Sequence, residues 1–197
     1  MEEKNRCQWV HNQPELYIEY HDKDWGVPVK NDEMLFEFLI LEGAQAGLSW
    51  FTILKRRENY KKAFANFDVQ KVVTFNAETI EKLMKNEGII RNRRKIEGTI
   101  ANAQVFIEIQ QEYGSFSKYI WGFVDDKSIQ NRIKTIKELP AKTELSEKIS
   151  KDLKSHGFNF CGPTIVYAWM EACGIVNNHL VSCPCHEKIK YLSSNIE

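Results

Sequence analysis

Residues 31–46 read NDEMLFEFLILEGAQA, and this stretch decides the fold class. Asn31 or Asp32 can cap a helix that runs to about Ala46. Its inward stripe consists of Leu35, Leu39, Glu42 and Ala46, with Phe38 beside it. One member of this apolar stripe is a carboxylate, and an ionised Glu42 would be costly to bury without a partner. The stretch therefore predicts a core helix and singles out Glu42.

Apolar residues recur at helical spacing on the C-terminal side of this helix. Ser49 and Asn76 can each cap a further helix, and a longer helix is expected to end by Gly114. The inward positions are Ile53, Tyr60 and Phe64 in the first, Ile80, Leu83 and Met84 in the second, and Ile96, Ile100, Ala103 and Ile107 in the third. A shorter helix through Tyr119 and Phe123 follows.

The last third of the chain begins with a polar segment. Residues 125–143 alternate in charge and contain Pro140, so they predict an irregular connection within a single unit of two helical lobes over 1–197. Pro163 opens a nearly all-apolar helix over 164–172, which should be central. The helix before it has apolar positions at Leu145, Ile149 and Leu153 and ends at Gly157. No stretch shows sustained period-two alternation, so the predicted fold class is all-α.

The composition of the 197 residues excludes several classes of protein. Hydrophobic residues make up 43% and charged residues 27%, and no apolar run approaches the ~18 residues of a membrane-spanning helix. Disordered, collagen-like and membrane-spanning chains are therefore excluded. Basic and acidic residues number 27 each, so nucleic acid would have to be held by a local basic patch. The charged start, residues 1–5, has no export signal, and a cytoplasmic location is expected.

Cysteines and histidines near the two ends form a candidate metal site. Five cysteines are an odd number in a reducing compartment, which makes a disulfide framework the weakest interpretation. His179 and Cys183 are spaced to chelate one ion, and Cys7 with His21 would complete a tetrahedral shell that suits structural zinc. Such a zinc would tie the termini together. Alternatively, these cysteines are small buried hydrophobes and the histidines are ordinary hydrogen-bonded residues. Rival ligands are Cys185 and His186.

A second candidate site combines aromatic rings with one carboxylate. Its members are Trp9, Tyr17, Tyr20, Trp25, Glu42 and Trp50. An electron-rich box of this kind favours a flat, positively charged heterocycle. The competing interpretation is a buried glutamate that caps a neighbouring helix, surrounded by ordinary core aromatics.

A third candidate is the basic segment KNEGIIRNRRK at residues 85–95. Gly88 allows a sharp turn, and the N terminus of the following helix offers free N–H groups to a phosphate. The local positive field comes from Arg91, Arg93, Arg94 and Lys95. A solvated, cationic helix start is the more common explanation of such a run.

Five segments taken together carry a family pattern. They are Cys7-x-Trp9, YIEYHDKDWGVP at 17–28, LEGAQAGLSW at 41–50, GIIR at 88–91, and His179-x₃-Cys183. These segments resemble bacterial 3-methyladenine DNA glycosylase I, a family of the helix-hairpin-helix superfamily, over nearly the whole chain. Two features depart from the wider superfamily. Ile90 replaces the second turn glycine, and no aspartate lies between Asp68 and Asp125, an absence for which this family is known.

The resemblance implies a helix-hairpin-helix glycosylase whose structural zinc is held by Cys7, His21, His179 and Cys183. It also implies that Tyr20 and Trp50 stack on an extruded base while Glu42 hydrogen-bonds its edge. Further substrate-binding candidates are Tyr17, Trp9 and Trp25. The hairpin would span 83–96 and bind DNA through Gly88, Ile89, Arg91, Arg93, Arg94 and Lys95. We expect a monomer that acts on double-stranded alkylated DNA and releases free 3-methyladenine, without a membrane or an organic or redox cofactor.

The missing aspartate has a chemical rationale. In 3-methyladenosine the base is already cationic, so cleavage releases a neutral leaving group and needs no general acid. An ionised Glu42 would favour this cation over adenine, and its replacement by Gln or Ala should lower excision with little change in stability. A lyase mechanism at Lys95 lacks its aspartate, and an iron–sulfur cluster lacks spaced cysteines. The remaining alternative is a zinc-stabilised, non-catalytic protein that binds DNA through the Gly88 hairpin.

Overall fold

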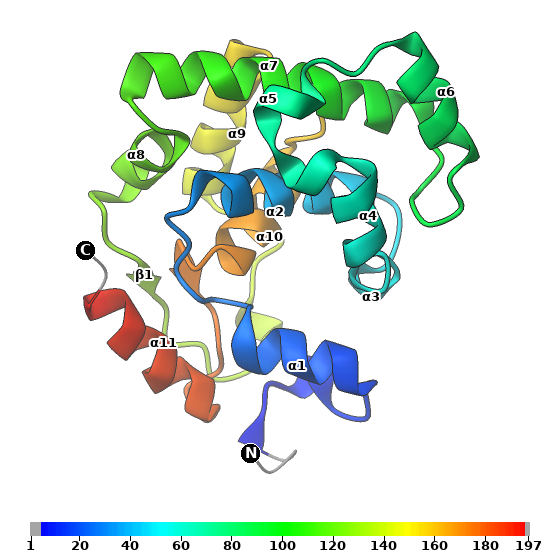
Figure 1. Cartoon of the computed structure of the whole chain (residues 1–197). Coiled ribbons are helices and arrows are strands. Elements are labelled where there is room, and N and C mark those ends of the chain that lie inside the picture. Colours follow the sequence, from blue (N-terminus) through cyan, green and yellow to red (C-terminus); the bar gives the residue numbers. More distant parts are fainter. Residues whose placement is uncertain (1–4, 196–197) are drawn as a thin grey trace.

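The computed structural model describes residues 5–195, so most of the charged start lies outside it. α-Helices dominate this part of the chain (Figure 1). They are α1 (Glu15–Lys23), α2 (Asp32–Gln45), α3 (Trp50–Leu54), α4 (Arg57–Ala63), α5 (Val69–Val72), α6 (Ala77–Lys85), α7 (Arg93–Tyr113), α8 (Phe116–Trp121), α9 (Glu144–His156), α10 (Pro163–Ala172) and α11 (Pro184–Ser194). Short 3₁₀ turns are η2 (Gln8–Val10), η3 (Ala65–Phe67), η4 (Gly122–Val124) and η5 (Ile136–Glu138), and the strands are β1 (Ile129–Gln130) and β2 (Val176–Asn177). Within residues 5–195, no helix combines the length and apolar character needed to cross a membrane.

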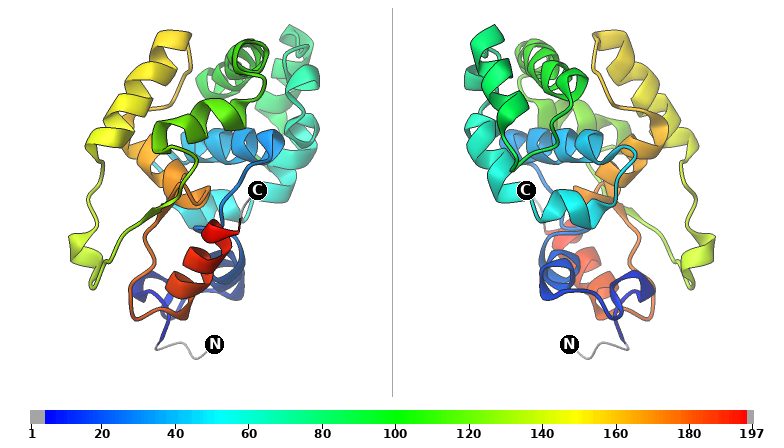
Figure 2. Two further views of the ribbon diagram at one scale, coloured as in Figure 1. Left: turned by 90° about the vertical axis from the view of Figure 1, so that its left-hand side faces the viewer. Right: turned by 90° about the vertical axis from the view of Figure 1, so that its right-hand side faces the viewer.

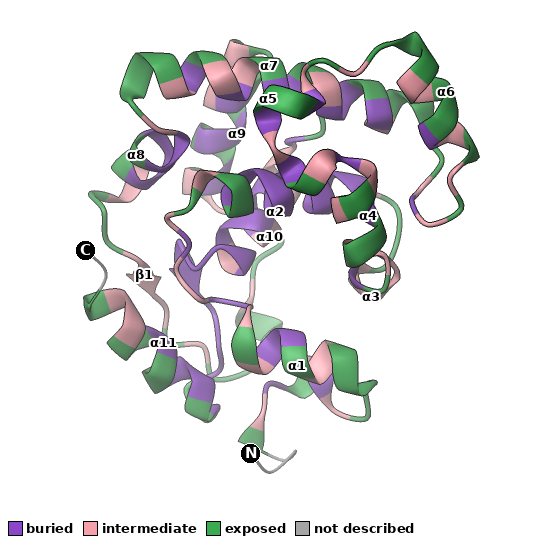
Figure 3. Ribbon diagram, viewed as in Figure 1, coloured by how far each residue is buried: buried purple, intermediate pink, exposed green. Residues whose placement is uncertain are grey.

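The helix predicted from residues 31–46 is α2, which lies in the middle of the molecule. The side-chain oxygen of Asn31 accepts a hydrogen bond from the Met34 N–H at 2.9 Å, which confirms the predicted cap. Residues 35–44 are all buried, as the purple ribbon of α2 shows in Figure 3. The single predicted stripe was too narrow because α3, α7, α8 and α10 enclose the helix. α10, predicted to be central, packs against α2 and α9.

Three further predicted helix ends are confirmed by their backbone geometry. Asn76 caps α6 by accepting a hydrogen bond from the Thr79 N–H at 3.0 Å. Gly114 and Gly157 adopt left-handed conformations and end α7 and α9. Polar caps and glycines thus mark these boundaries in the sequence itself.

The single helix predicted after Ser49 is wrong, because the chain turns at Arg56 between α3 and α4. Ser49 does cap α3. After the turn, the Arg57 guanidinium donates hydrogen bonds to the carboxylates of Asp24 and Glu37, each at 2.6 Å. These partners are distant in sequence, so the orientation of α4 depends on tertiary contacts that no local periodicity encodes.

Several short elements were not predicted, namely α1, α5, α11 and the strand pair. Residues 125–143 contain β1 and η5 and are otherwise irregular, and β1 pairs in parallel with β2, with Ile129 opposite Val176. A two-residue strand is too short to show alternation, so the sequence carries no signal for it. The pairing attaches the connection to the chain between α10 and α11.

The N-terminal helix α1 and the C-terminal helix α11 lie beneath the body formed by α2, α7, α9 and α10 (Figures 1 and 2). Lys188 of α11 donates a hydrogen bond from Nζ to the backbone oxygen of Asp22 in α1 at 2.9 Å. Gly174, just after α10, has a φ of +67°, and a Cβ at this position would lie 2.4 Å from the Pro28 nitrogen. Only glycine permits the α1–α2 link to approach the end of α10 this closely.

Candidate active site

Aromatic and acidic side chains line a hollow of about 650 Å³ between the N-terminal elements, α2 and α10. Its walls are Trp9, Tyr17, Tyr20, Trp25, Glu42, Gln45, Trp50, Leu139, Ala168 and Glu171. All six residues predicted for the aromatic and acidic site are in this set.

The aromatic rings of this hollow pack against one another. The ring centroids of Tyr20 and Trp50 lie 5.4 Å apart, and those of Trp9 and Trp25 lie 5.0 Å apart. Tyr17 and Tyr20 are three residues apart on α1 and so face the same side. Burial raises the pKa of both tyrosines, with a further contribution from Glu42, so their hydroxyls stay neutral at physiological pH.

Glu42 is a buried acid without a counter-charge. Its side chain is 4% exposed and receives no hydrogen bond from the described residues, so the interpretation as a helix cap is wrong. Burial, and secondarily the nearby carboxyl of Glu171, raise the pKa of Glu42 to about 8. A buried carboxyl group that lacks both an ion-pair partner and a hydrogen bond is suited to bind a cation or a hydrogen-bond donor.

Trp50 lines the same hollow and carries an unpaired hydrogen-bond donor. Its indole N–H is buried and has no hydrogen-bond partner among the described residues. Buried polar groups are nearly always paired, so an unpaired donor in a pocket wall indicates a position where a ligand acceptor binds.

Glu171 is a site residue that the sequence reasoning missed. It is half-buried, and its Oε1 accepts a hydrogen bond from the Asn178 Nδ2 at 2.7 Å. Burial raises the pKa of Glu171 to about 7, and the Asn178 hydrogen bond opposes this rise. The missed signal is that Glu171 is the one charged residue of α10, within PTIVYAWMEA.

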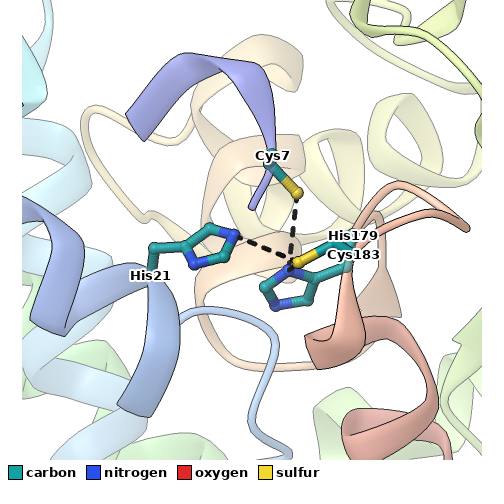
Figure 4. Close-up of side chains that lie close together, drawn as sticks. All are labelled: Cys7, His21, His179 and Cys183. Carbon is teal, nitrogen blue, oxygen red and sulfur yellow. Dashed lines mark hydrogen bonds between the residues drawn. The ribbon is translucent and has the colours of Figure 1, made fainter. Parts of the chain in front are cut away.

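Cys7, His21, His179 and Cys183 come together as predicted, and all four are buried (Figure 4). Their ligand atoms lie within 4.8 Å of one another. Cys7 Sγ is 3.6 Å from His179 Nδ1, and Cys183 Sγ is 3.7 Å from His21 Nε2. In a tetrahedral zinc site, bonds of about 2.3 Å to sulfur and about 2.0 Å to nitrogen place such atoms about 3.5 Å apart. The four residues therefore fit one zinc ion.

Hydrogen bonds to the outer ring nitrogens orient both histidines for metal binding. His179 Nε2 donates to the Trp25 carbonyl oxygen at 3.0 Å, which leaves the Nδ1 lone pair facing the sulfurs. His21 Nδ1 lies 2.8 Å from the Asp22 carboxylate, which leaves its Nε2 lone pair facing Cys183. The neighbouring Cys185 and Cys7 thiols lower the pKa of Cys183 and so favour its thiolate.

The two rival ligands lie outside the four-residue cluster. His186 Nε2 is 2.9 Å from the Asn131 carbonyl oxygen, and its Nδ1 is 3.2 Å from the Glu187 carboxylate, so both ring nitrogens have other partners. Cys185 adjoins His21 on the side of Asp22. Geometry thus favours the predicted four ligands.

The methyladenine glycosylase family model matches residues 9–186. The chain belongs to this family. It is 46% identical to DNA-3-methyladenine glycosylase 1 of Escherichia coli (strain K12), over 92% of this chain and 96% of that protein. A crystal structure of 3-methyladenine DNA glycosylase I has a TM-score of 0.89 at 45% identity, over 92% of this chain and 99% of the other. The Staphylococcus aureus enzyme, solved to show the structural basis of 3-methyladenine recognition, has a TM-score of 0.88 at 39% identity, over 91% of this chain and 95% of that chain.

In this methyladenine glycosylase, the basic segment forms the turn from α6 into α7. Gly88 donates its N–H to Asn86 Oδ1 at 2.8 Å, and a Cβ on Gly88 would lie 2.9 Å from the Asn59 side chain. Glycine is therefore needed for space rather than for an unusual φ. Ile89 is buried and anchors the turn, and the Ile90 N–H donates to the Tyr60 hydroxyl at 3.1 Å.

The basic side chains of this turn divide into two groups. Arg91, Arg93 and Arg94 are exposed, and Arg93 pairs with Glu81. Lys95 points elsewhere, because its Nζ donates hydrogen bonds to the carbonyl oxygens of Ala44 and Ala46 at 2.7 and 2.8 Å. Lys95 thus neutralises the C-terminal end of α2, and a DNA contact by Lys95 would have to compete with these bonds.

Proposed function

We propose that this methyladenine glycosylase extrudes 3-methyladenine from alkylated double-stranded DNA and hydrolyses its N-glycosidic bond, without a lyase step, as the start of base excision repair. The observation that carries this proposal is the convergence of Glu42, Tyr20 and Trp50 in one hollow of a chain from this family. We infer that the protein acts as a monomer in the cytoplasm.

Capture of the base requires that stacking in the pocket offsets the free energy lost when the base leaves the DNA duplex. Extruding a base costs a few kcal/mol, and less for a damaged one. Each stacking contact with an aromatic ring returns roughly 1–3 kcal/mol, so Tyr20 and Trp50 together can hold the extruded base.

Glu42 supplies selectivity for charge. Below about pH 8 the carboxyl group of Glu42 is largely neutral in the free protein. A cationic base in the hollow lowers the pKa of Glu42 and so favours its ionised, negatively charged form. Neutral adenine offers no such compensation. Because binding of the cationic ground state alone would slow cleavage, the carboxylate must also stabilise the oxocarbenium-like transition state or orient water.

We propose that Cys7, His21, His179 and Cys183 hold one zinc ion. The ion would be structural, because four protein ligands leave no open position for catalysis. Its ligands would join η2 and α1 to the segment before α11, and α1 carries Tyr17 and Tyr20. The support is the donor set, the spacing of its atoms and the orientation of both histidines.

We also propose that α6, the turn and α7 form a helix-hairpin-helix that binds the DNA backbone. Replacing Arg91 or Arg94 with alanine should weaken DNA binding without changing base preference. Each lost phosphate contact should reduce the slope of log affinity against log salt by about one. Fluorescence anisotropy at several salt concentrations measures this. Arg132→Ala, an exposed arginine on the connection, is the control, and an equal loss in that variant would contradict the assignment.

Release of free base from methylated DNA tests the function itself. Purified protein should liberate 3-methyladenine while leaving abasic DNA with intact strands, as chromatography of the products and gel analysis of the DNA would show. A zinc-stabilised binding module would retain DNA and release no base. Strand cleavage along with base release would contradict the absence of a lyase step.

A further inference from the structure

We propose that Glu171 is a second specificity-determining acid of this pocket, and that Glu42 and Glu171 act as an electrostatically coupled carboxyl pair that retains one proton until a cationic base binds. This inference rests on the proposed function and deepens it. The pair would make the pocket a sensor of positive charge on the base as well as of its shape.

The fold places the two carboxyls on facing helices. Glu42 lies on α2, Glu171 lies on α10, and these helices pack directly against each other. Both residues line the same hollow, together with Trp50. The backbone oxygen of Glu171 also accepts a hydrogen bond from the Gly26 N–H at 3.0 Å, which fixes the end of α10 beside the pocket wall.

A chain of amides orients the Glu171 carboxyl. Asn178 Nδ2 donates to Glu171 Oε1 at 2.7 Å and to the Tyr167 hydroxyl oxygen at 2.8 Å. Asn131 Nδ2 donates in turn to Asn178 Oδ1 at 2.8 Å. This network occupies one carboxyl oxygen, and the described residues give no partner to the other. Oε2 is therefore available to a ligand.

No cation offsets the two acids. The pocket walls contain no lysine or arginine among the described residues. The other titratable groups near the pair are Tyr17 and Tyr20 from α1, Tyr167 from α10 and Cys173 after it. Burial raises the pKa of all four, so they are neutral at pH 7.

Two acids in this setting titrate as a pair. Burial raises the pKa of Glu42 to about 8 and that of Glu171 to about 7, and the charge of Glu171 contributes to the rise at Glu42. Near pH 7.5, midway between these values, the pair thus carries about one negative charge. A cationic base favours the second ionisation and expels the remaining proton, whereas neutral adenine does neither.

Binding of a stable cation mimic tests this pair without DNA or catalysis. The probe is 3,9-dimethyladeninium, which keeps its positive charge, and 9-methyladenine is its neutral counterpart. In the wild type, affinity for the cation should rise in two steps from about pH 6 to about pH 9, with proton release measurable by calorimetry in two buffers. Affinity for the neutral probe should stay flat.

Glu171→Gln keeps the hydrogen bond from Asn178 and removes only the charge. This variant should bind the cation about fivefold to tenfold more weakly at pH 7.5 to 8, with neutral binding unchanged. Its affinity should rise in a single step, about half a pH unit or more lower, because Glu42 loses its acidic neighbour. Glu171→Asp should restore most of the preference for the cation. Glu33→Gln, on the exposed first turn of α2, is the matched control.

A merely structural Glu171 would leave the ratio of cation to neutral affinity and its pH dependence unchanged in Glu171→Gln, and this result would overturn the pair. Should that variant not fold, a single-step pH dependence in the wild type would equally overturn it. Failure of the proposed function is distinguishable, because it would appear as wild-type protein that releases no base from methylated DNA.

Discussion

Glu42→Gln is expected to reduce excision of 3-methyladenine by roughly 10²–10³-fold, the usual loss when one preorganised electrostatic group is removed from a transition state. The amide can still accept a hydrogen bond from the base, but it cannot supply the negative charge. Single-turnover release of base from methylated DNA measures the loss. Glu33→Gln, on the same helix but exposed, should retain full activity.

The structure changes the sequence-based expectation of little effect on stability, because Glu42→Gln should be more stable than the wild type at alkaline pH. The pKa of Glu42 is raised from 4.5 to about 8 in the folded protein, so its ionisation disfavours folding. This penalty begins as pH rises above about 4.5, is complete above about 8, and amounts to a few kcal/mol. Thermal unfolding at pH 5 and pH 8.5 should show a stabilisation of Glu42→Gln that grows with pH.

For the activity prediction, near-normal excision of 3-methyladenine by Glu42→Gln would show that Glu42 has no part in the mechanism.

Loss of the proposed zinc is expected to have the largest effect on stability. Cys7→Ser, or prolonged chelation of the wild type, should lower Tm by on the order of 10 °C, because removing a metal ligand typically costs several kcal/mol. Elemental analysis of the wild type should give one zinc per chain, and the variant should contain much less.

Cys161→Ser is the matched control for that experiment. Cys161 is also buried, but it donates its thiol hydrogen to the Phe158 carbonyl oxygen at 3.4 Å, a bond that serine can reproduce. Its zinc content should equal that of the wild type. A wild-type protein that folds normally without metal would refute the structural zinc.

Local signals account for the parts of the fold that were predicted. The Asn31 and Asn76 caps and the left-handed Gly114 and Gly157 act within a few residues of the helix ends they set, so the sequence displays them directly. After the break at Arg56, the orientation of α4 is fixed by ion pairs of Arg57 with other segments, and β1 is too short to show a period. These features become visible only when distant segments meet.

The residues of the site likewise divide into those that the local sequence reveals and those that only the folded structure reveals. Glu42 is visible in the sequence because a carboxylate on an apolar stripe conflicts with its surroundings, and the aromatic residues grouped with it do line the same hollow. Glu171 carries the same signal in α10, but it lies 129 positions along the chain in a helix that periodicity assigned to the core. Lys95 was assigned to DNA because its neighbours are basic, whereas its ammonium is bound to the end of α2.

The hydrogen bonds of Lys95 have a mechanical consequence. Its ammonium joins the N terminus of α7, which follows the basic turn, to the C terminus of α2, one turn beyond Glu42. These two hydrogen bonds therefore couple the position of the proposed DNA-binding turn to that of the helix that carries Glu42. A substitution that removes the Lys95 ammonium would loosen this link between the bound backbone and the pocket, although Lys95 itself would touch neither DNA nor base.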